Sequence, residues 1–344
     1  MKRCIALLSI CLLLFTGCGG GGIGKIVLTT GFRSDEVFRI EDTSCALSEI
    51  LVYLLDIRAS YDGRYGEGIW ETETADGTLE DGIKNAALSR ISQVKTMNLL
   101  ARDMQITLSG EERDLCVQAA ERYDTALSDE MRASLNGVTR ETLIRMYEEY
   151  ALADKLYRYI IRDINPEISD DEARTITVQQ IFIRKDAQTN AIGGDVARAI
   201  AMNAYAEARA GEDFKTLIDR YSDAPESTVS FGKGEREEHF ETIAFNLETD
   251  EISSVIETEE GYYILKCLTT FNREETDANK LKIVAARKRE VFAEEYDTFA
   301  ASLAKDLNES LWEDVHVPSE RQDTENAFFA IYASTFPPAS EQAH

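Results

Sequence analysis

TITVQQIFIR, at residues 175–184, is where the hydrophobic pattern of the chain changes its period. Beta-branched and aromatic residues dominate this stretch, as expected of a buried strand. Residues 44–162, which precede it, instead repeat apolar side chains every three to four positions, the spacing of amphipathic helices. This change predicts an α+β chain of two domains, for which 344 residues are enough.

The strand at 175–184 opens a mixed block that we expect to span residues 174–271. Gly211 is suited to end the first helix of this block, because glycine is favoured just after a helix C-terminus. The other elements predicted in the block are two helices and two strands, over residues 195–209, 213–221, 252–255 and 262–267.

The segments on either side of this block are predicted to form one all-helical domain. Thr78 with Asp81, and Ser109 with Glu112, have the spacing of capping residues at helix starts. We expect the N-terminal part at residues 25–165, opening with a strand-like piece at 25–32 and helical from Ser44 onward. The C-terminal part is one helix at 280–312. Its apolar stripe is too wide to stay uncovered, so the helix should pack on the N-terminal helices. The polar tail, 318–344, is expected to be disordered apart from the apolar patch Phe328–Tyr332, for which the sequence gives no explanation.

The N-terminus has the layout of an exported lipoprotein. Lys2 and Arg3 precede an apolar run of about 11 residues, which is too short to span a membrane. The following Thr16-Gly17-Cys18 resembles the bacterial lipobox, with Phe15 where leucine is usual. We therefore expect a signal peptide at 1–17, and a lipidated Cys18 with a Gly-rich tether at 18–24 that holds the protein on the extracytoplasmic face of the membrane.

Charge and cysteine content exclude several classes of function. The net charge is −26, and removal of residues 1–17 takes away two basic and no acidic residues, which gives −28. Such a chain does not bind nucleic acid by counterion release. Three cysteines remain in the mature chain besides Cys18, and their wide spacing predicts neither disulfides nor zinc. We expect Cys45, Cys116 and Cys267 to be small buried side chains, and no metal or cofactor to be bound.

The mixed block resembles the parvulin-type (PpiC) peptidyl-prolyl isomerase domain. The resemblance rests on an ordered series of short motifs, VQQIFI at 178–183, AGEDF at 210–214, YSD at 221–223, FETIAFNL at 240–247, EIS at 251–253 and GYYILK at 261–266. The whole layout is similar to the PrsA-type foldase lipoproteins, in which a helical chaperone region surrounds a parvulin domain. This resemblance implies a foldase whose partners are unfolded exported polypeptides with X-Pro bonds. The sequence is also compatible with a homodimer.

Typical parvulin sites use two histidines, an aspartate or cysteine, and a methionine and phenylalanine that line the proline pocket. The two histidine positions fall on Gln180 and Tyr263, and the acidic or thiol position on Ser227. The methionine position falls on Arg236, and the phenylalanine is kept as Phe240. The resemblance thus implies catalytic roles for the first three residues and substrate binding for the last two.

Two interpretations of this altered set stay open. Gln180 and Tyr263 both donate and accept hydrogen bonds, so they could still act on a prolyl amide across the two strands. Alternatively, the domain is a degenerate isomerase kept for binding, and the protein is a non-catalytic holdase. A solute-binding lipoprotein is disfavoured by the long helical first half. A hydrolase is disfavoured because neither a G-x-S-x-G nor an H-E-x-x-H motif is present.

Overall fold

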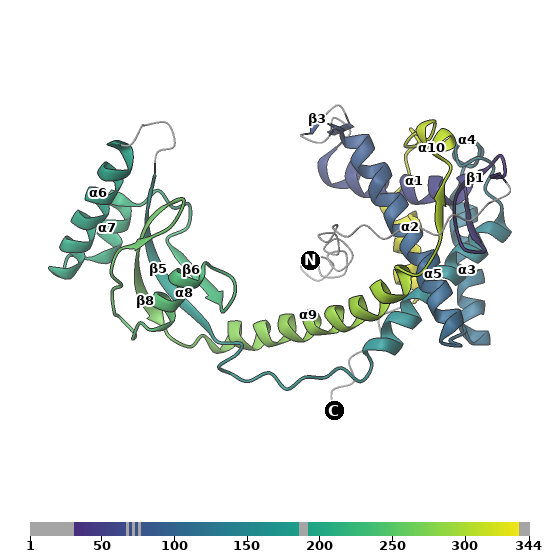
Figure 1. Ribbon diagram of the computed structural model, residues 1–344. Helices are drawn as coiled ribbons and strands as arrows, with labels where there is room; N and C mark the ends of the chain where they lie inside the picture. Colours follow the sequence, from purple (N-terminus) through teal and green to yellow (C-terminus); the bar gives the residue numbers. More distant parts are fainter. Residues whose placement is uncertain (1–30, 67–68, 71–72, 75–76, 186–191, 337–344) are drawn as a thin grey trace. The chain divides into compact units, whose positions relative to one another are not determined.

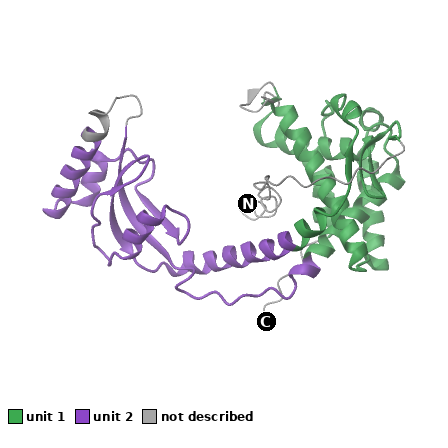
Figure 2. Ribbon diagram, in the orientation of Figure 1, with its two compact units in different colours: residues 1–157, 295–344 green, residues 158–294 purple. Residues whose placement is uncertain are grey.

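The computed structural model describes residues 31–66, 69–70, 73–74, 77–185 and 192–336. The chain divides into two compact units, unit 1 of residues 1–157 and 295–344 and unit 2 of residues 158–294 (Figure 2). Each unit combines helices with a sheet, which confirms the mixed fold class (Figure 1). The signal peptide, Cys18 and the tether lie outside the described residues. Within the described residues no helix is both long and apolar enough to cross a membrane.

Unit 1 is built mainly from helices whose starts follow local capping signals. Its first five helices are α1 (Leu47–Tyr65), α2 (Leu79–Asp103), α3 (Gly110–Ala126), α4 (Asp129–Ser134) and α5 (Arg140–Ile161). The Thr78 hydroxyl accepts the backbone N–H of Asp81 at 3.2 Å, and the Ser109 hydroxyl accepts that of Glu112 at 3.1 Å. Both predicted helix starts are therefore confirmed.

Unit 1 also holds a small sheet, so the prediction of an all-helical domain was wrong in this respect. The strands run in the order β2 (Thr43–Ala46), β1 (Glu36–Ile40) and β9 (Lys305–Leu307), and all pairs are antiparallel. Ser44 lies in β2 and does not open a helix. The strand-like piece predicted at 25–32 is mostly outside the described residues. A two-stranded hairpin, β3 (Glu73–Thr74) and β4 (Gly77–Thr78), precedes α2.

The single C-terminal helix predicted at 280–312 was also wrong. Helix α9 (Arg273–Ala300) begins earlier and ends earlier, and it is followed by β9 and α10 (Glu309–Glu313). The break allows residues 305–307 to pair with β1, where Asp306 lies opposite Arg39. The Asn308 side chain then accepts the N–H of Leu311 at 3.4 Å and starts α10.

The tail is ordered as far as Phe336, which corrects the prediction of disorder over 318–344. A 3₁₀ turn at Thr324–Asn326 leads into helix α11 (Phe328–Thr335). Phe328 and Ile331 of this helix are fully buried in the core of unit 1. Residues 337–344 lie outside the described residues.

Unit 2 contains a four-stranded antiparallel sheet. The strands lie in the order β6 (Thr228–Gly232), β5 (Thr175–Arg184), β8 (Gly261–Thr269) and β7 (Ile256–Glu257). The helices are α6 (Ile192–Arg209), α7 (Phe214–Tyr221) and α8 (Glu238–Phe245). Strand β5 and helix α7 lie where the sequence predicted them, whereas β6 and α8 were missed. The strand predicted at 252–255 lies instead at β7, and Ile252 forms only an isolated bridge to Lys266.

The first turns of α9 are fastened to the sheet of unit 2. The Thr276 hydroxyl accepts the N–H of Thr175 at 3.1 Å, and the Asn279 amide donates to the carbonyl of Ala173 at 3.1 Å. A side chain at Gly232 would approach the Asn279 amide nitrogen to 2.5 Å. Unit 2 therefore extends past residue 271, where the predicted block ended, into the first turns of α9.

The predicted cysteine environment is confirmed. Cys45, Cys116 and Cys267 are all free thiols, and each is fully buried. Burial raises the pKa of Cys116 to about 12, so this thiol stays protonated at neutral pH.

Candidate functional site

The two faces of the unit 2 sheet are covered by different helices. On one face, Ile181 of β5 and Ile264 of β8 pack with residues of α6 and α7. On the other, Val178 of β5 and Leu265 of β8 pack with Phe240 and other residues of α8. Because successive side chains of a strand point to opposite faces, Gln180 of β5 shares the α8 face.

An aromatic cluster occupies this second face. Tyr263 lies opposite Phe182 in the register of β5 and β8, and the two rings stack with centroids 4.5 Å apart. The ring of Phe240, which is 4% exposed, meets Tyr263 edge-on at 5.2 Å. Phe231 of β6 lies 5.6 Å from Phe240. These rings form a continuous apolar cluster in which Tyr263 is partly exposed and the other three rings are buried.

Gln180 lies one diagonal step from Tyr263, since it pairs with Leu265. It is nearly buried, and its side-chain amide donates to the carbonyl of Glu226 at 2.9 Å. Its backbone N–H donates to the carbonyl of Ser227, also at 2.9 Å. Within the described residues no hydrogen bond joins Gln180 to Tyr263. The Gln180 amide is therefore used to hold the loop before β6.

Ser227 and Arg236, the two remaining positions implied by the parvulin resemblance, have exposed side chains. The backbone carbonyl of Ser227 accepts the hydrogen bond from the backbone N–H of Gln180. Arg236 places its guanidinium 5.7 Å from the ring centroid of Phe231. The loop that carries Arg236 is held by Glu241, whose carboxylate accepts the N–H groups of Gly234 and Arg236 at 3.0 and 2.8 Å.

Tyr263 is a neutral hydroxyl in this environment. Burial raises its pKa above the ordinary value, and the nearby charge of Glu260 adds to the effect. The charge of Arg236 acts in the opposite direction and is outweighed. At neutral pH the Tyr263 hydroxyl can donate a hydrogen bond to an amide, but it cannot serve as a base.

Three residues of this face were not singled out from the sequence. Phe182 supports the Tyr263 ring, Phe231 supports Phe240, and Glu241 holds the Arg236 loop. Strand alternation from Gln180 could have placed Phe182 on the same face. Phe231 lies in the strand that was missed, and the role of Glu241 depends on loop geometry that has no sequence signal.

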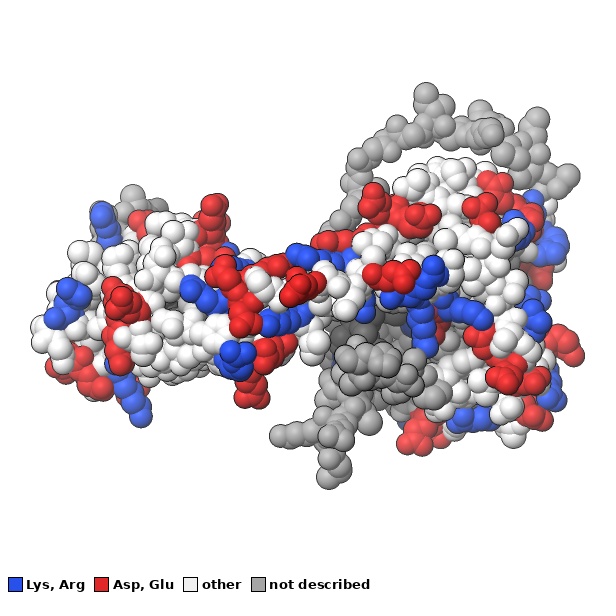
Figure 3. Space-filling model, turned by 90° about the horizontal axis from the view of Figure 1, so that it is seen from below, with Lys and Arg blue, Asp and Glu red and all other residues white. Residues whose placement is uncertain are grey.

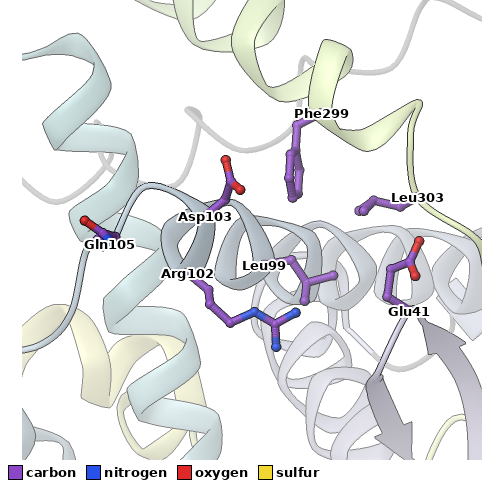
Figure 4. Close-up of a pocket in the computed structure, with 7 residues that line it drawn as sticks. All are labelled: Glu41, Leu99, Arg102, Asp103, Gln105, Phe299 and Leu303. Atoms are coloured by element: carbon purple, nitrogen blue, oxygen red, sulfur yellow. The ribbon is translucent and has the colours of Figure 1, made fainter.

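Unit 1 has a separate hollow of about 340 Å³ (Figure 4). Leu99, Phe299 and Leu303 form its apolar lining, and the carboxylates of Glu41 and Asp103 lie at its edge. Arg102 also lines the hollow, but its guanidinium is paired with Asp42 at 2.9 and 3.0 Å. An apolar wall with acidic groups at the edge suits a side chain with an aliphatic stem and a positive end.

The charges on one face of the molecule can be followed in Figure 3. On the face in Figure 3, acidic and basic side chains are intermixed over both units and form no continuous basic area. Among the described residues, no group of three His, Cys, Asp or Glu side chains is placed to hold a metal ion.

A known family matches the part of the chain that contains this aromatic cluster. Residues 181–269 match the family described as Rotamase, the PPIC-type PPIase domain. This part of the chain is therefore similar to PPIC-type rotamase domains. The match begins within β5 and ends with β8, so it contains Tyr263, Phe240 and the loop of Arg236, and starts one residue after Gln180. By this resemblance the enzyme class is peptidyl-prolyl isomerase.

Two relatives that cover part of the chain are PrsA foldase proteins. The foldase protein PrsA of Clostridium acetobutylicum is 20% identical over 279 residues, which cover 72% of this chain and 79% of that protein. The foldase protein PrsA of Halalkalibacterium halodurans is 40% identical over 62 residues, 16% of this chain and 19% of that protein. The chain is therefore similar to a PrsA-type foldase that carries a PPIC-type rotamase domain.

Two solved structures have some similarity to this chain. The peptidylprolyl isomerase PrsA of Bacillus cereus has a TM-score of 0.38 at 18% identity, covering 76% of this chain and 97% of that one. The foldase protein PrsA of Streptococcus pneumoniae has a TM-score of 0.31 at 21% identity, covering 72% and 88% of the two chains.

Proposed function

We propose that this protein is a membrane-anchored extracytoplasmic foldase that binds unfolded exported polypeptides and isomerises their X-Pro bonds weakly. The lipid on Cys18 is the anchor. The rotamase domain supplies the isomerase site, and unit 1, with its hollow at Leu99 and Phe299, contributes binding of unfolded chains. One observation carries the proposal: Phe240, Tyr263 and Gln180 lie together on one face of a PPIC-type sheet.

The chemistry needs no covalent step. Rotation about a prolyl amide has a barrier of about 20 kcal/mol because the twisted state loses amide resonance. Only contacts that are stronger in the twisted state accelerate the rotation. The rings of Phe240 and Tyr263 hold the proline, and the Tyr263 hydroxyl donates to the twisted amide.

Weak activity follows from how the two polar residues are engaged. The Gln180 amide is already bonded to the Glu226 carbonyl, and the Tyr263 ring is stacked on Phe182. In a typical parvulin site the two histidines at these positions are hydrogen-bonded to each other. Gln180 and Tyr263 do not form such a pair. A lost preorganised donor costs about 3 kcal/mol, or roughly a hundredfold in rate.

The main test pairs a proline-peptide isomerase assay with an aggregation-suppression assay on the full mature chain. We expect weak isomerase activity and clear suppression. The double variant Gln180→His with Tyr263→His should raise kcat/KM without changing suppression. Vigorous activity in the unaltered protein that neither Phe240→Ala nor Tyr263→Phe reduces would show that the site is misplaced.

The second candidate is a holdase without catalysis. It is favoured by the same engaged Gln180, because a side chain that holds a loop contributes nothing to rotation. Complete absence of isomerase activity, in the double-histidine variant as well, together with full suppression of aggregation would select this alternative.

The anchor has its own test. Cys18→Ser should abolish lipid labelling and release the mature protein from membranes into the soluble fraction. Unchanged membrane retention of this variant would refute the lipid anchor while leaving the foldase proposal intact.

A further inference from the structure

The apolar end of the tail is seated in an aromatic groove of unit 1. Helix α11 (Phe328–Thr335) packs against α1 and α3 and contacts α5 through its rings. The groove is lined by four tyrosines from these helices, Tyr53, Tyr123, Tyr147 and Tyr150. Phe328 and Ile331, three residues apart on one side of α11, are fully buried in it.

Two aromatic side chains of the tail, Phe328 and Phe329, occupy distinct positions in this groove. Phe328 stacks on Tyr147 with ring centroids 4.1 Å apart. Phe329 meets Tyr53 edge-on at 5.1 Å, and the guanidinium of Arg90 lies 3.4 Å from its ring centroid. Such ring contacts accept different aromatic or aliphatic side chains without requiring one sequence.

The groove also recognises the main chain of its occupant. The Asp56 carboxylate accepts the N–H of Phe329 at 2.9 Å, and the Tyr147 hydroxyl donates to the carbonyl of Phe328 at 3.1 Å. Asp56 is 4% exposed and Tyr147 is fully buried. Every peptide bond offers the same donor and acceptor, so these two contacts would be available to other segments that enter the groove.

The link to α11 is polar and consists of the 3₁₀ turn Thr324–Asn326, which contacts α1 and α3. Residues 323–326 are exposed, and α11 forms no strand pairing with the rest of unit 1. An occupant attached to the same chain by so short a link benefits from a high effective concentration. A segment from another chain must compete with it.

We propose that the groove under α11 is a peptide-binding site for short apolar helical segments of unfolded polypeptides, and that the chain's own tail occupies it at rest. This rests on the proposed function, because clients of a foldase supply such segments. The preferred client segment carries an aromatic residue followed three and four positions later by apolar residues, the spacing of Phe328, Ile331 and Tyr332. A client binds when it displaces the tail.

The test uses the full mature chain with a protease site inserted between Asp323 and Thr324. Cleavage breaks the covalent connection between α11 and the rest of unit 1, and we expect α11 to stay in the groove without it. The probes are three fluorescent peptides. The first has the sequence of residues 324–336. The second is an unrelated Ala/Gln/Lys helix with Phe, Ile and Tyr at the spacing of the tail, and the third is that helix with serine at those three positions.

Fluorescence anisotropy should show that the first two peptides bind the cleaved protein at least about tenfold more tightly than the uncleaved protein. The serine peptide should not bind. Tyr147→Phe should weaken binding of both peptides to the cleaved protein about fivefold, since one main-chain hydrogen bond is lost. In the uncleaved chain, Phe328→Ala should strengthen binding of the second peptide, whereas the exposed control Ala333→Ser should not.

Three results would overturn the proposal. If cleavage unfolds unit 1, the tail is a fixed part of the core. If only the tail-sequence peptide binds, the groove serves this chain alone, and if no peptide binds, it is not a site. Failure of the isomerase and aggregation assays would refute the proposed function separately, because peptide binding is measured directly.

Discussion

Tyr263 lies directly opposite Phe182 on the neighbouring strand, and the two rings stack with centroids 4.5 Å apart. The adjacent residue, Tyr262, points to the other face and packs with α6 and α7. Of these two neighbouring tyrosines, Tyr263 lies at the candidate site and Tyr262 lies in the hydrophobic core on the opposite face of the sheet. This arrangement supplies a matched pair for testing the site.

Tyr263→Phe keeps both ring contacts and removes only the hydroxyl. We expect kcat/KM on a proline peptide to fall by about fivefold, because the lost donor to the twisted amide is not preorganised and contributes only about 1 kcal/mol. The matched control Tyr262→Phe should leave kcat/KM unchanged. A protease-coupled isomerase assay measures both, and equal losses in the two variants would assign the effect to folding and not to the site.

Gly261→Ala should disrupt the pairing that positions this face. An added Cβ would lie 2.3 Å from the carbonyl oxygen of Ile183 and 2.6 Å from a ring carbon of Phe182. The atom closest to the added Cβ belongs to the backbone of a paired strand and cannot move without disturbing the sheet. We therefore expect a loss of about 1–3 kcal/mol in the stability of unit 2. Gly82→Ala, in α2 with no atom within 4 Å of the added Cβ, should instead stabilise unit 1 by up to about 1 kcal/mol. Calorimetry distinguishes these outcomes, and a neutral Gly261→Ala would contradict the strand register.

Asp56 should make the stability of unit 1 depend on pH. Burial raises its pKa from 3.8 to about 6, although the N–H of Phe329 opposes the shift. The folded state therefore binds more protons than the unfolded state between these values. The stability due to this group is fully present below about pH 4 and is lost as the pH rises through about 6, a change of about 3 kcal/mol.

Asp56→Asn keeps an oxygen acceptor for Phe329 and removes the titration. We expect the variant to be more stable than the unaltered protein at pH 7–8 and the difference to vanish near pH 4. Urea unfolding followed by tryptophan fluorescence reports on unit 1, because both tryptophans, Trp70 and Trp312, lie in it. A stability difference that does not vary between pH 4 and 8 would contradict the assignment to Asp56.

Lys95 is a buried cation in unit 1 whose removal should be costly. It is 1% exposed, and its ammonium lies 3.0 Å from Glu49 and 2.8 Å from Glu149. Burial opposes its charge, but the carboxylates of Glu149 and Glu49 outweigh burial and raise the pKa of Lys95. Lys95→Met leaves buried carboxylates without this partner and should destabilise unit 1 by about 3–5 kcal/mol.

The control for Lys95 is an exposed ion pair of the same helix. Arg102 pairs with Asp42, and both side chains are more than half exposed. Arg102→Ala should cost less than about 1 kcal/mol, because water screens this pair. Tryptophan-monitored urea unfolding compares the two variants. Similar losses would show that the buried position of Lys95 has no special role.

Local signals in the sequence were sufficient for much of the fold. The hydroxyls of Thr78 and Ser109 cap helices that the sequence placed at these residues, because a cap involves residues only three positions apart. Strand β5 runs over Thr175–Arg184, as its composition predicted. The PPIC-type domain could also be identified from an ordered series of short motifs.

Contacts between distant residues decided the rest. The strand β9 exists because residues 305–307 meet β1, and α11 is ordered because its rings meet tyrosines of three helices. Gln180 has a side chain capable of acting on an amide, yet its amide is bonded to the carbonyl of Glu226. A pattern of residue types specifies which groups can form a hydrogen bond or an apolar contact. Only the tertiary structure determines which of these groups come within bonding distance, because those partners are brought together by packing and not by their spacing in the chain.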